Sequence, residues 1–135
     1  MAQEVAAKLE GEGISAAVIN ARFAKPIDTA MLEFYARTVD ALVTMEDHVL
    51  QGGFGSAMLE ELNNLGLATP VVRLGWPDQF IEHGKPEALR TKYGISVEAA
   101  LQRLKPLLQR GKTQDAAQIQ SRQISGNVLE WSLER

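Results

Sequence analysis

The chain has 135 residues, the length of one domain, and 45% of them are hydrophobic and 23% charged. Its net charge of -3 leaves no excess of Lys or Arg to neutralise phosphates, which argues against nucleic acid or a membrane surface as a partner. The absence of cysteine excludes disulfides, thiolate metal sites and cysteine nucleophiles. Residues 1–10 have the pattern of an amphipathic helix and not of a signal peptide, so we expect a cytoplasmic location.

Helices and strands alternate in the first part of the sequence. Apolar residues three and four positions apart predict a helix over residues 1–11. The apolar run at residues 16–19 predicts a strand that is covered on both faces. Asp28 is placed to cap a second helix, and residues 41–45 predict a second strand.

The glycine-rich residues 52–56 follow this second strand and lead into a third helix. We expect that helix to place Met58, Leu59 and Leu62 on its inner face. Residues 70–74 then predict a third strand, whose first residue is a proline that need not donate a hydrogen bond.

Two further helices are indicated by their end signals. Pro86 opens a short helix and Gly94 closes it. Ser96 caps the last clear helix, whose apolar residues keep the helical period over three turns. Gly111 is predicted to end that helix.

This alternation indicates an α/β domain of three layers, α/β/α, with a mainly parallel sheet and right-handed crossovers. We expect the domain to occupy residues 1–111. Residues 112–135 are interpreted as a polar tail, in which Leu129, Trp131 and Leu133 alternate with polar residues as they would in a short strand.

Polar clusters follow the predicted strands, at the edge where open α/β sheets place their active sites. A carboxylate beside a histidine could supply a general base, but such pairs are common by chance and strand-end polar residues often serve interfaces. No catalytic, cofactor-binding or metal-binding residue is therefore predicted. The predicted contacts with another domain or across a dimer are Arg22, Lys25, Glu46, His48, Phe54, Trp76, Asp78 and His83.

Residues 52–56 open a helix, so their backbone N–H groups could hold an anion. The segment lacks the Lys-Ser/Thr of a P-loop and the spacing of a dinucleotide fingerprint. We therefore interpret it as a tight turn whose glycines let the helix approach the sheet.

Four segments resemble the C-terminal domain of the 1-deoxy-D-xylulose-5-phosphate synthase family, in the family's order and over roughly residues 1–108. Residues 22–28 (RFAKPID) are similar to its R-F-x-K-P-L/I-D stretch, and residues 43–47 (VTMED) to V-T-x-E-E/D. Residues 52–56 (GGFGS) are similar to G-G-F/A-G-S, and residues 74–84 (LGWPDQFIEHG) to L-G-x-P-D-x-F-I-x-x-G.

The resemblance implies a transketolase C-terminal-like domain of a transferase that condenses pyruvate with glyceraldehyde 3-phosphate and releases carbon dioxide. The product is a precursor of isoprenoids, thiamine and pyridoxal. Thiamine diphosphate and magnesium are implied for the full-length enzyme, where the upstream domains hold them, so no cofactor residue carries over to this chain. The resemblance implies a mainly structural, dimer-forming role, with the upstream domains and a second copy as partners, and an inactive fragment.

In the family a strand and a glycine turn precede the first helix, and Met1 falls just after that place. We therefore expect a fragment whose sheet lacks its first strand. An unpaired sheet edge is a liability. Our hypothesis is that residues 129–133 pair in the vacant position, either within their own chain or exchanged between two chains.

Two alternatives stay open. The beta chain of a 2-oxoacid dehydrogenase ends in a similar domain with a Pro-x-Asp turn and a Gly-rich helix opening, although Phe23, Lys25 and residues 80–84 favour the synthase. The other alternative, from a different class, is a stand-alone regulatory module that binds an anion at residues 52–56.

Overall fold

The computed structural model describes residues 1–118 and 127–133, with side chains for residues 1–108. Helices and strands alternate along most of the chain, as the sequence predicts. In chain order the elements are α1 (Ala2–Gly11), β1 (Ser15–Asn20), α2 (Thr29–Ala36), β2 (Ala41–Val49), α3 (Phe54–Asn64), β3 (Val71–Trp76), α4 (Pro86–Lys92), α5 (Val97–Gln118) and β4 (Asn127–Leu133).

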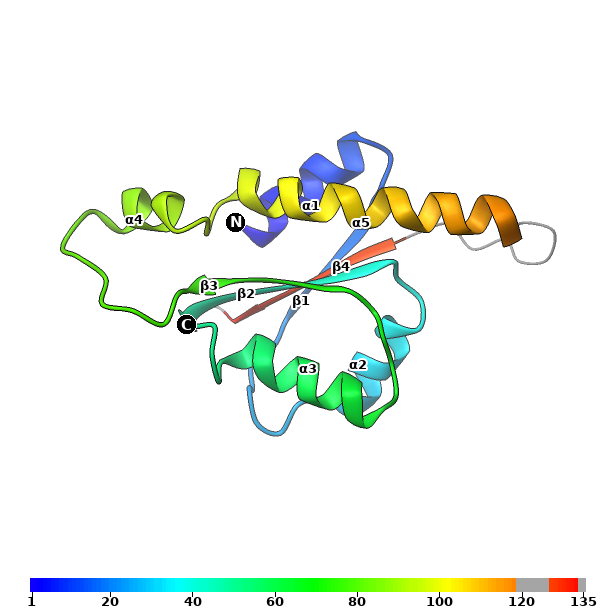
Figure 1. Cartoon of the computed structure of the whole chain (residues 1–135), viewed down its shortest axis with the longest axis horizontal. Helices are drawn as coiled ribbons and strands as arrows, with labels where there is room; N and C mark the ends of the chain where they lie inside the picture. The colour runs from blue at the N-terminus through cyan, green and yellow to red at the C-terminus, as the bar shows by residue number, and fades with distance from the viewer. Residues whose placement is uncertain (119–126, 134–135) are drawn as a thin grey trace.

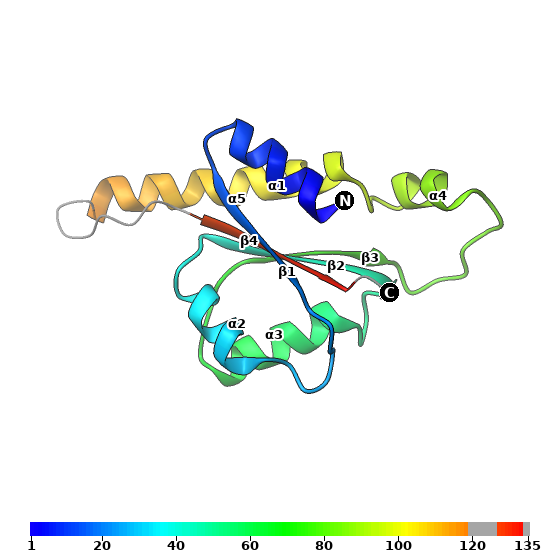
Figure 2. The ribbon, with the colours of Figure 1, turned by 180° about the vertical axis from the view of Figure 1, so that it is seen from behind.

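The described strands form one parallel sheet in the order β1-β4-β2-β3. Helices α1 and α5 lie on one face of the sheet, and α2 and α3 lie on the other (Figures 1 and 2). The predicted three-layer α/β/α class is thereby confirmed. Helix α4 lies beyond the end of the sheet, on a segment that extends away from the three layers (Figure 1).

Strand β2 divides the core into two parts because its side chains alternate between the two faces. Val43 and Met45 are buried among residues of α1 and α5. Leu42 is buried on the opposite face with Met58 and Leu62 of α3. Every residue of β2 from Ala41 to Glu46 is buried, which makes this strand the rigid support for the loop that follows it.

Local signals located three helix ends correctly. The Asp28 carboxylate accepts a hydrogen bond from the Met31 N–H at 2.9 Å, which confirms the predicted cap of α2. Ser96 Oγ accepts one from the Ala99 N–H at 3.2 Å at the start of α5. Gly94 follows α4 with a φ of +73°, a left-handed conformation that favours glycine.

Three predictions are wrong: the burial of residues 16–19, the burial of Leu59 and the end of the last helix. Residues 16–19 are not covered on both faces, because β1 is the edge strand and its helices cover it only in part; Val18 is 39% exposed. Leu59 is 41% exposed, since it lies beside the buried stripe of α3 and not within it. Gly111 does not end the last helix, which continues to Gln118. A single glycine costs a helix only about 1 kcal/mol, so good helix formers on both sides can carry the helix through it.

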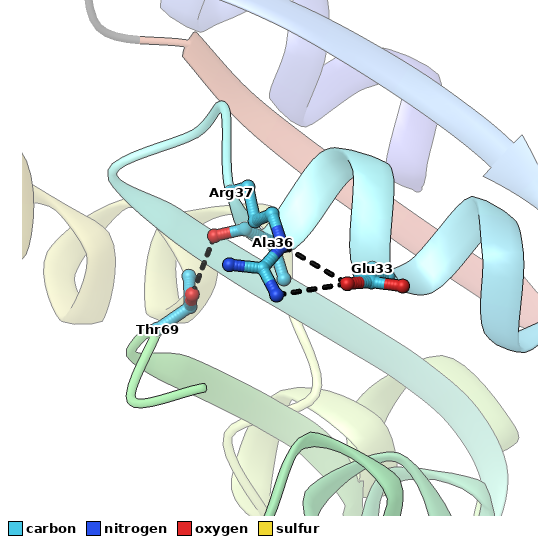
Figure 3. Close-up of polar contacts among 4 residues, drawn as sticks. All are labelled: Glu33, Ala36, Arg37 and Thr69. Carbon is cyan, nitrogen blue, oxygen red and sulfur yellow. Dashed lines mark hydrogen bonds and ion pairs between the residues drawn. The ribbon is translucent and has the colours of Figure 1, made fainter. Parts of the chain in front are cut away.

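The end of α2 is held at the edge where β2 and β3 begin. The Thr69 hydroxyl, from the loop before β3, donates a hydrogen bond to the Ala36 carbonyl at 2.6 Å (Figure 3). That carbonyl lies in the last turn of α2, where backbone acceptors lack a partner within the helix. Arg37 and Glu33 form an ion pair of 2.8 Å beside it. This edge is opposite the one at which the candidate site lies.

Candidate functional site

An open cleft of about 420 Å³ lies at the carboxyl ends of β1 and β2, against the start of α3. Ligands of open α/β sheets bind at this edge. The sequence predicted contact residues here, and the structure brings five of them to the same cleft. The residues that line it are Arg22, Ala24, Lys25, Glu46, Asp47, His48, Gly52, Gly53, Phe54 and Ala57.

The Glu46 carboxylate forms the inner wall of the cleft and caps α3. Its two oxygens accept hydrogen bonds from the Phe54 N–H at 2.6 Å and from the Gly55 N–H at 3.0 Å. Glu46 is only 3% exposed. Its charge lies at the positive end of the helix dipole, where an anion is stabilised. A side chain predicted as an interface contact therefore binds within its own chain.

Glycines make room for this carboxylate. A Cβ atom at Gly55 would lie 2.6 Å from Thr44 Oγ1 and 2.9 Å from Arg73 Cδ. A Cβ at Gly75 would lie 2.9 Å from both Glu46 Cγ and the His48 carbonyl. The glycines thus allow the start of α3 and the end of β3 to approach β2 closely, which confirms the interpretation of residues 52–56 as a close-packing turn.

The remaining donors of this turn are also bound within the chain. The Gly52 N–H donates to Ser56 Oγ at 3.1 Å, and the Ser56 hydroxyl donates to the Leu50 carbonyl at 2.7 Å. Arg73 donates to the same Ser56 oxygen at 2.9 Å. An anion at the start of α3 would therefore compete with Glu46 and Ser56 for donors that are already engaged.

The outer rim of the cleft carries unpaired positive charge. The Arg22 and Lys25 side chains are exposed and form no hydrogen bond or ion pair with any residue that the structure describes. The His48 ring is exposed as well, and its Nδ1 lies 3.0 Å from the Val49 carbonyl. Phe54, in contrast, is 4% exposed and packs in the α2–α3 core. The exposed rim, and not the buried floor, is available to a partner.

Asp47 joins the end of β2 to the end of β3 and to α4. Its carboxylate accepts a hydrogen bond from Trp76 Nε1 at 2.7 Å and pairs with Arg90 at 2.9 Å. The Trp76 ring meets the Tyr93 ring edge to face, with centroids 6.0 Å apart. Trp76 was predicted as a contact residue, and within this chain it connects Asp47 to the region of α4.

The loop before α4 is fixed at Glu82. The Glu82 carboxylate accepts hydrogen bonds from the Lys92 ammonium and from the Tyr93 hydroxyl, the latter at 2.6 Å. The hydrogen bond from Lys92, followed by that from Tyr93, lowers the pKa of Glu82 to about 2. Asp78 and His83 lie exposed on the same loop, and Phe80 is fully exposed there. The loop thus exposes one aromatic and two polar side chains, none of which lines the cleft.

Reasoning from the sequence found five of the ten residues that line the cleft but missed two of its features. It did not identify the contact between Glu46 and the start of α3, and it did not pair Asp47 with Arg90. Both contacts join residues from different elements, and no local spacing indicates them. Over the part of the chain that the structure describes, no three His, Asp or Glu residues gather as metal ligands would. Over the same part, no helix is long and apolar enough to cross a membrane.

Comparison with known families shows which family has this fold. The family described as "Transketolase, C-terminal domain" matches residues 1–99. The chain belongs to that family. All eight predicted contact residues, and the whole cleft, lie inside the matched segment, whereas β4 and most of α5 lie beyond it.

The chain is also similar to curated proteins named 1-deoxy-D-xylulose-5-phosphate synthase. It is 61% identical over 110 residues to that of Acidobacterium capsulatum, covering 82% of this chain and 18% of the relative. It is 59% identical over 113 residues to that of Methylacidiphilum infernorum, covering 84% and 18%. With the protein of Heliobacterium modesticaldum the identity is 49% over 96 residues, covering 71% and 15%. The chain thus spans less than a fifth of the length of these relatives.

Proposed function

We propose that this chain is the C-terminal domain of a 1-deoxy-D-xylulose-5-phosphate synthase, a transferase that condenses pyruvate with glyceraldehyde 3-phosphate in the cytoplasm. The 61% identity to a protein of that name carries the proposal. In this assignment thiamine diphosphate and magnesium bind to other domains of the enzyme. The domain described here supplies contacts to those domains and across a homodimer.

The cleft supports a role in contacts more than a role in chemistry. Both of its carboxylates are engaged, Glu46 by the start of α3 and Asp47 by Trp76 and Arg90. Arg22 and Lys25, in contrast, carry charges that pair with no residue in the described part of the chain. Exposed cations beside a concave surface pair readily with carboxylates of a neighbouring domain.

The projecting loop is the second proposed contact surface. Phe80 is fully exposed, and large aromatic side chains are enriched at interfaces and costly to leave in water. Asp78 and His83 flank it on the same loop. Glu82 holds this loop against α4, so the loop is presented in a defined position.

The test replaces the corresponding domain of the Acidobacterium capsulatum synthase with residues 1–110 of this chain. We expect the chimera to form 1-deoxy-D-xylulose 5-phosphate from pyruvate and glyceraldehyde 3-phosphate with thiamine diphosphate and magnesium. We expect the isolated chain to form none. A chimera that folds and dimerises but is inactive would refute the assignment to the synthase, and so would turnover by the isolated chain.

Point variants of the chimera test the contact surfaces. Arg22→Ala with Lys25→Ala, and separately Phe80→Ala, should weaken the dimer or lower activity about tenfold, which corresponds to about 1.4 kcal/mol at an interface. The matched control is Arg37→Ala, an exposed arginine at the opposite edge of the sheet. Equal behaviour of the control and the surface variants would count against the proposed contacts.

A further inference from the structure

Residues 77–94, which include α4, form an arm that lies outside the hydrophobic core. Every residue of the arm is exposed or half-buried. The two core clusters of the described residues contain none of them. The arm extends beyond the end of the sheet, away from the three layers (Figures 1 and 2). Burial of apolar surface, which holds the helices on the sheet, therefore contributes little to the position of the arm.

The arm is closed on itself by contacts between its loop and its helix. The Glu82 carboxylate accepts hydrogen bonds from the Lys92 ammonium and from the Tyr93 hydroxyl, the latter at 2.6 Å. A Cβ at Gly84 would lie 3.1 Å from Leu89 Cγ, so the loop packs tightly on α4. These contacts join residues of the arm to one another. They fix its shape and not its position on the rest of the domain.

Asp47, at the end of β2, connects the arm to the rest of the domain. Its carboxylate pairs with Arg90 of α4 at 2.9 Å. The same carboxylate accepts a hydrogen bond from Trp76 Nε1 at 2.7 Å, and the Trp76 ring meets the Tyr93 ring edge to face. One ionic and one aromatic contact of the arm are thus both linked to this carboxylate.

These connections lie at the surface, so they hold the arm only weakly. The Arg90 and Asp47 side chains are 41% and 51% exposed, and solvent screens ion pairs at such exposure. Gly94 ends the arm with a φ of +73°, and glycine restrains the backbone less than any other residue. The next residue, Ile95, is buried. A flexible joint therefore separates the arm from the packed part of the domain.

We propose that residues 77–94 are a hinged arm and that the Asp47 carboxylate is the latch that sets its position. While the latch is closed, the arm holds Phe80 in one place relative to the cleft, which Asp47 also lines. When the latch opens, the arm moves as one unit while the sheet and its helices stay folded. Asp47 thereby couples the rim of the cleft to the loop with Phe80. That coupling of two contact surfaces rests on the proposed function, whereas the hinge and the latch belong to the chain itself.

Distances between paired spin labels test the latch in the 135-residue chain, which has no cysteine of its own. Ala88→Cys with Glu60→Cys places one label on α4 and one on α3, both at exposed positions. The matched control, Glu10→Cys with Glu60→Cys, places both labels on exposed positions of helices that cover the sheet. Double electron–electron resonance should give one narrow distance for each pair at low ionic strength.

Two variants open the latch from its two sides. Asp47→Asn removes the charge on β2, and Arg90→Met removes the charge on α4, outside the core. In each, the fraction of molecules in which positions 60 and 88 leave the narrow distance should rise about tenfold. About 1 M NaCl, which screens charges beyond about 3 Å, should do the same to the natural chain. Glu33→Gln breaks an ion pair of similar exposure elsewhere and should leave that distance unchanged.

The pKa of Glu82 shows whether the arm moves as a unit. The hydrogen bonds from Lys92 and Tyr93, which hold that pKa at about 2, lie within the arm and should persist when the latch is cut. A rise of the pKa towards 4.5 in Asp47→Asn would mean that the arm unravels, which overturns the proposal. It is also overturned if both latch variants keep the narrow distance between positions 60 and 88, or if the control pair at positions 10 and 60 changes equally. The experiment uses no substrate and no other domain, so its failure would leave the assignment to the synthase intact.

Discussion

The contact between Glu46 and the start of α3 gives the most direct test of the structure. Replacing Glu46 with glutamine keeps the size of the side chain but exchanges one acceptor oxygen for an NH₂ group. The Phe54 and Gly55 N–H groups both need an acceptor, so one of them would face a donor. Leaving one buried donor without a partner costs about 1–3 kcal/mol. Losing the charge at the helix N-terminus adds about 1 kcal/mol.

We therefore expect Glu46→Gln to lower the free energy of unfolding by about 2–4 kcal/mol. For a chain of this size about 4 °C of Tm corresponds to 1 kcal/mol, so Tm should fall by about 8–16 °C. Thermal unfolding followed by circular dichroism measures this. The control is Glu60→Gln on the exposed side of α3, which makes the same chemical change and should alter stability by less than about 0.5 kcal/mol. A Tm of Glu46→Gln within about 2 °C of the natural chain would refute the capping role.

Three further changes test the packing and the surface charges. Gly55→Ala places a Cβ 2.6 Å from Thr44 Oγ1 and should lower the free energy of unfolding, measured by chemical denaturation, by about 1–3 kcal/mol. The control Gly11→Ala meets no atom within 4 Å and should be neutral or slightly stabilising. Equal effects of the two variants would contradict the close packing at Gly55. Thr69→Val removes the hydrogen bond to the Ala36 carbonyl and should lower the free energy of unfolding by about 1 kcal/mol (Figure 3). Arg37→Ala breaks only an exposed ion pair and should lower it by less than about 0.5 kcal/mol. A larger effect of Arg37→Ala than of Thr69→Val would refute this prediction. The pKa of Glu82 is lowered from 4.5 to about 2, so its contacts stabilise the fold above about pH 4.5 and lose this effect as the pH falls through about 2. Lys92→Met should raise the pKa of Glu82 towards 4.5, which an NMR titration of its carboxyl carbon measures. An unchanged pKa would contradict the pairing of Glu82 with Lys92.

The sequence predicted those parts of the fold that depend on neighbouring residues. Asp28, Ser96 and Gly94 mark helix ends through contacts within one turn, and each does so in the structure. The buried run at residues 41–45 likewise becomes the first part of β2. Such features need only local sequence, because the partner group is three or four residues away.

Features that depend on distant residues were not accessible in the same way. The exposure of Val18 follows from the place of β1 at the sheet edge, which the period of its residues does not encode. The alternation at residues 129–133 indicates a strand, but the pattern alone does not say that β4 separates β1 from β2. The partners of Glu46 and Asp47 were missed for the same reason, since they come from α3, β3 and α4.

The engagement of Glu46 also predicts how the cleft responds to small anions. A free anion at the start of α3 would have to displace a carboxylate that is attached to the adjacent strand and already 2.6 Å from the Phe54 N–H. Phosphate, nucleotides and thiamine diphosphate at about 1 mM should therefore leave the Tm of the isolated chain unchanged within about 1 °C. Saturating a site a hundredfold above its Kd would instead add about 2.7 kcal/mol, or about 10 °C. A nucleotide could raise the Tm by that amount, and the double variant Arg22→Ala with Lys25→Ala could abolish the rise. That result would make the cleft a regulatory ligand site. It would also remove the main support for treating the rim of the cleft as a contact surface for another domain.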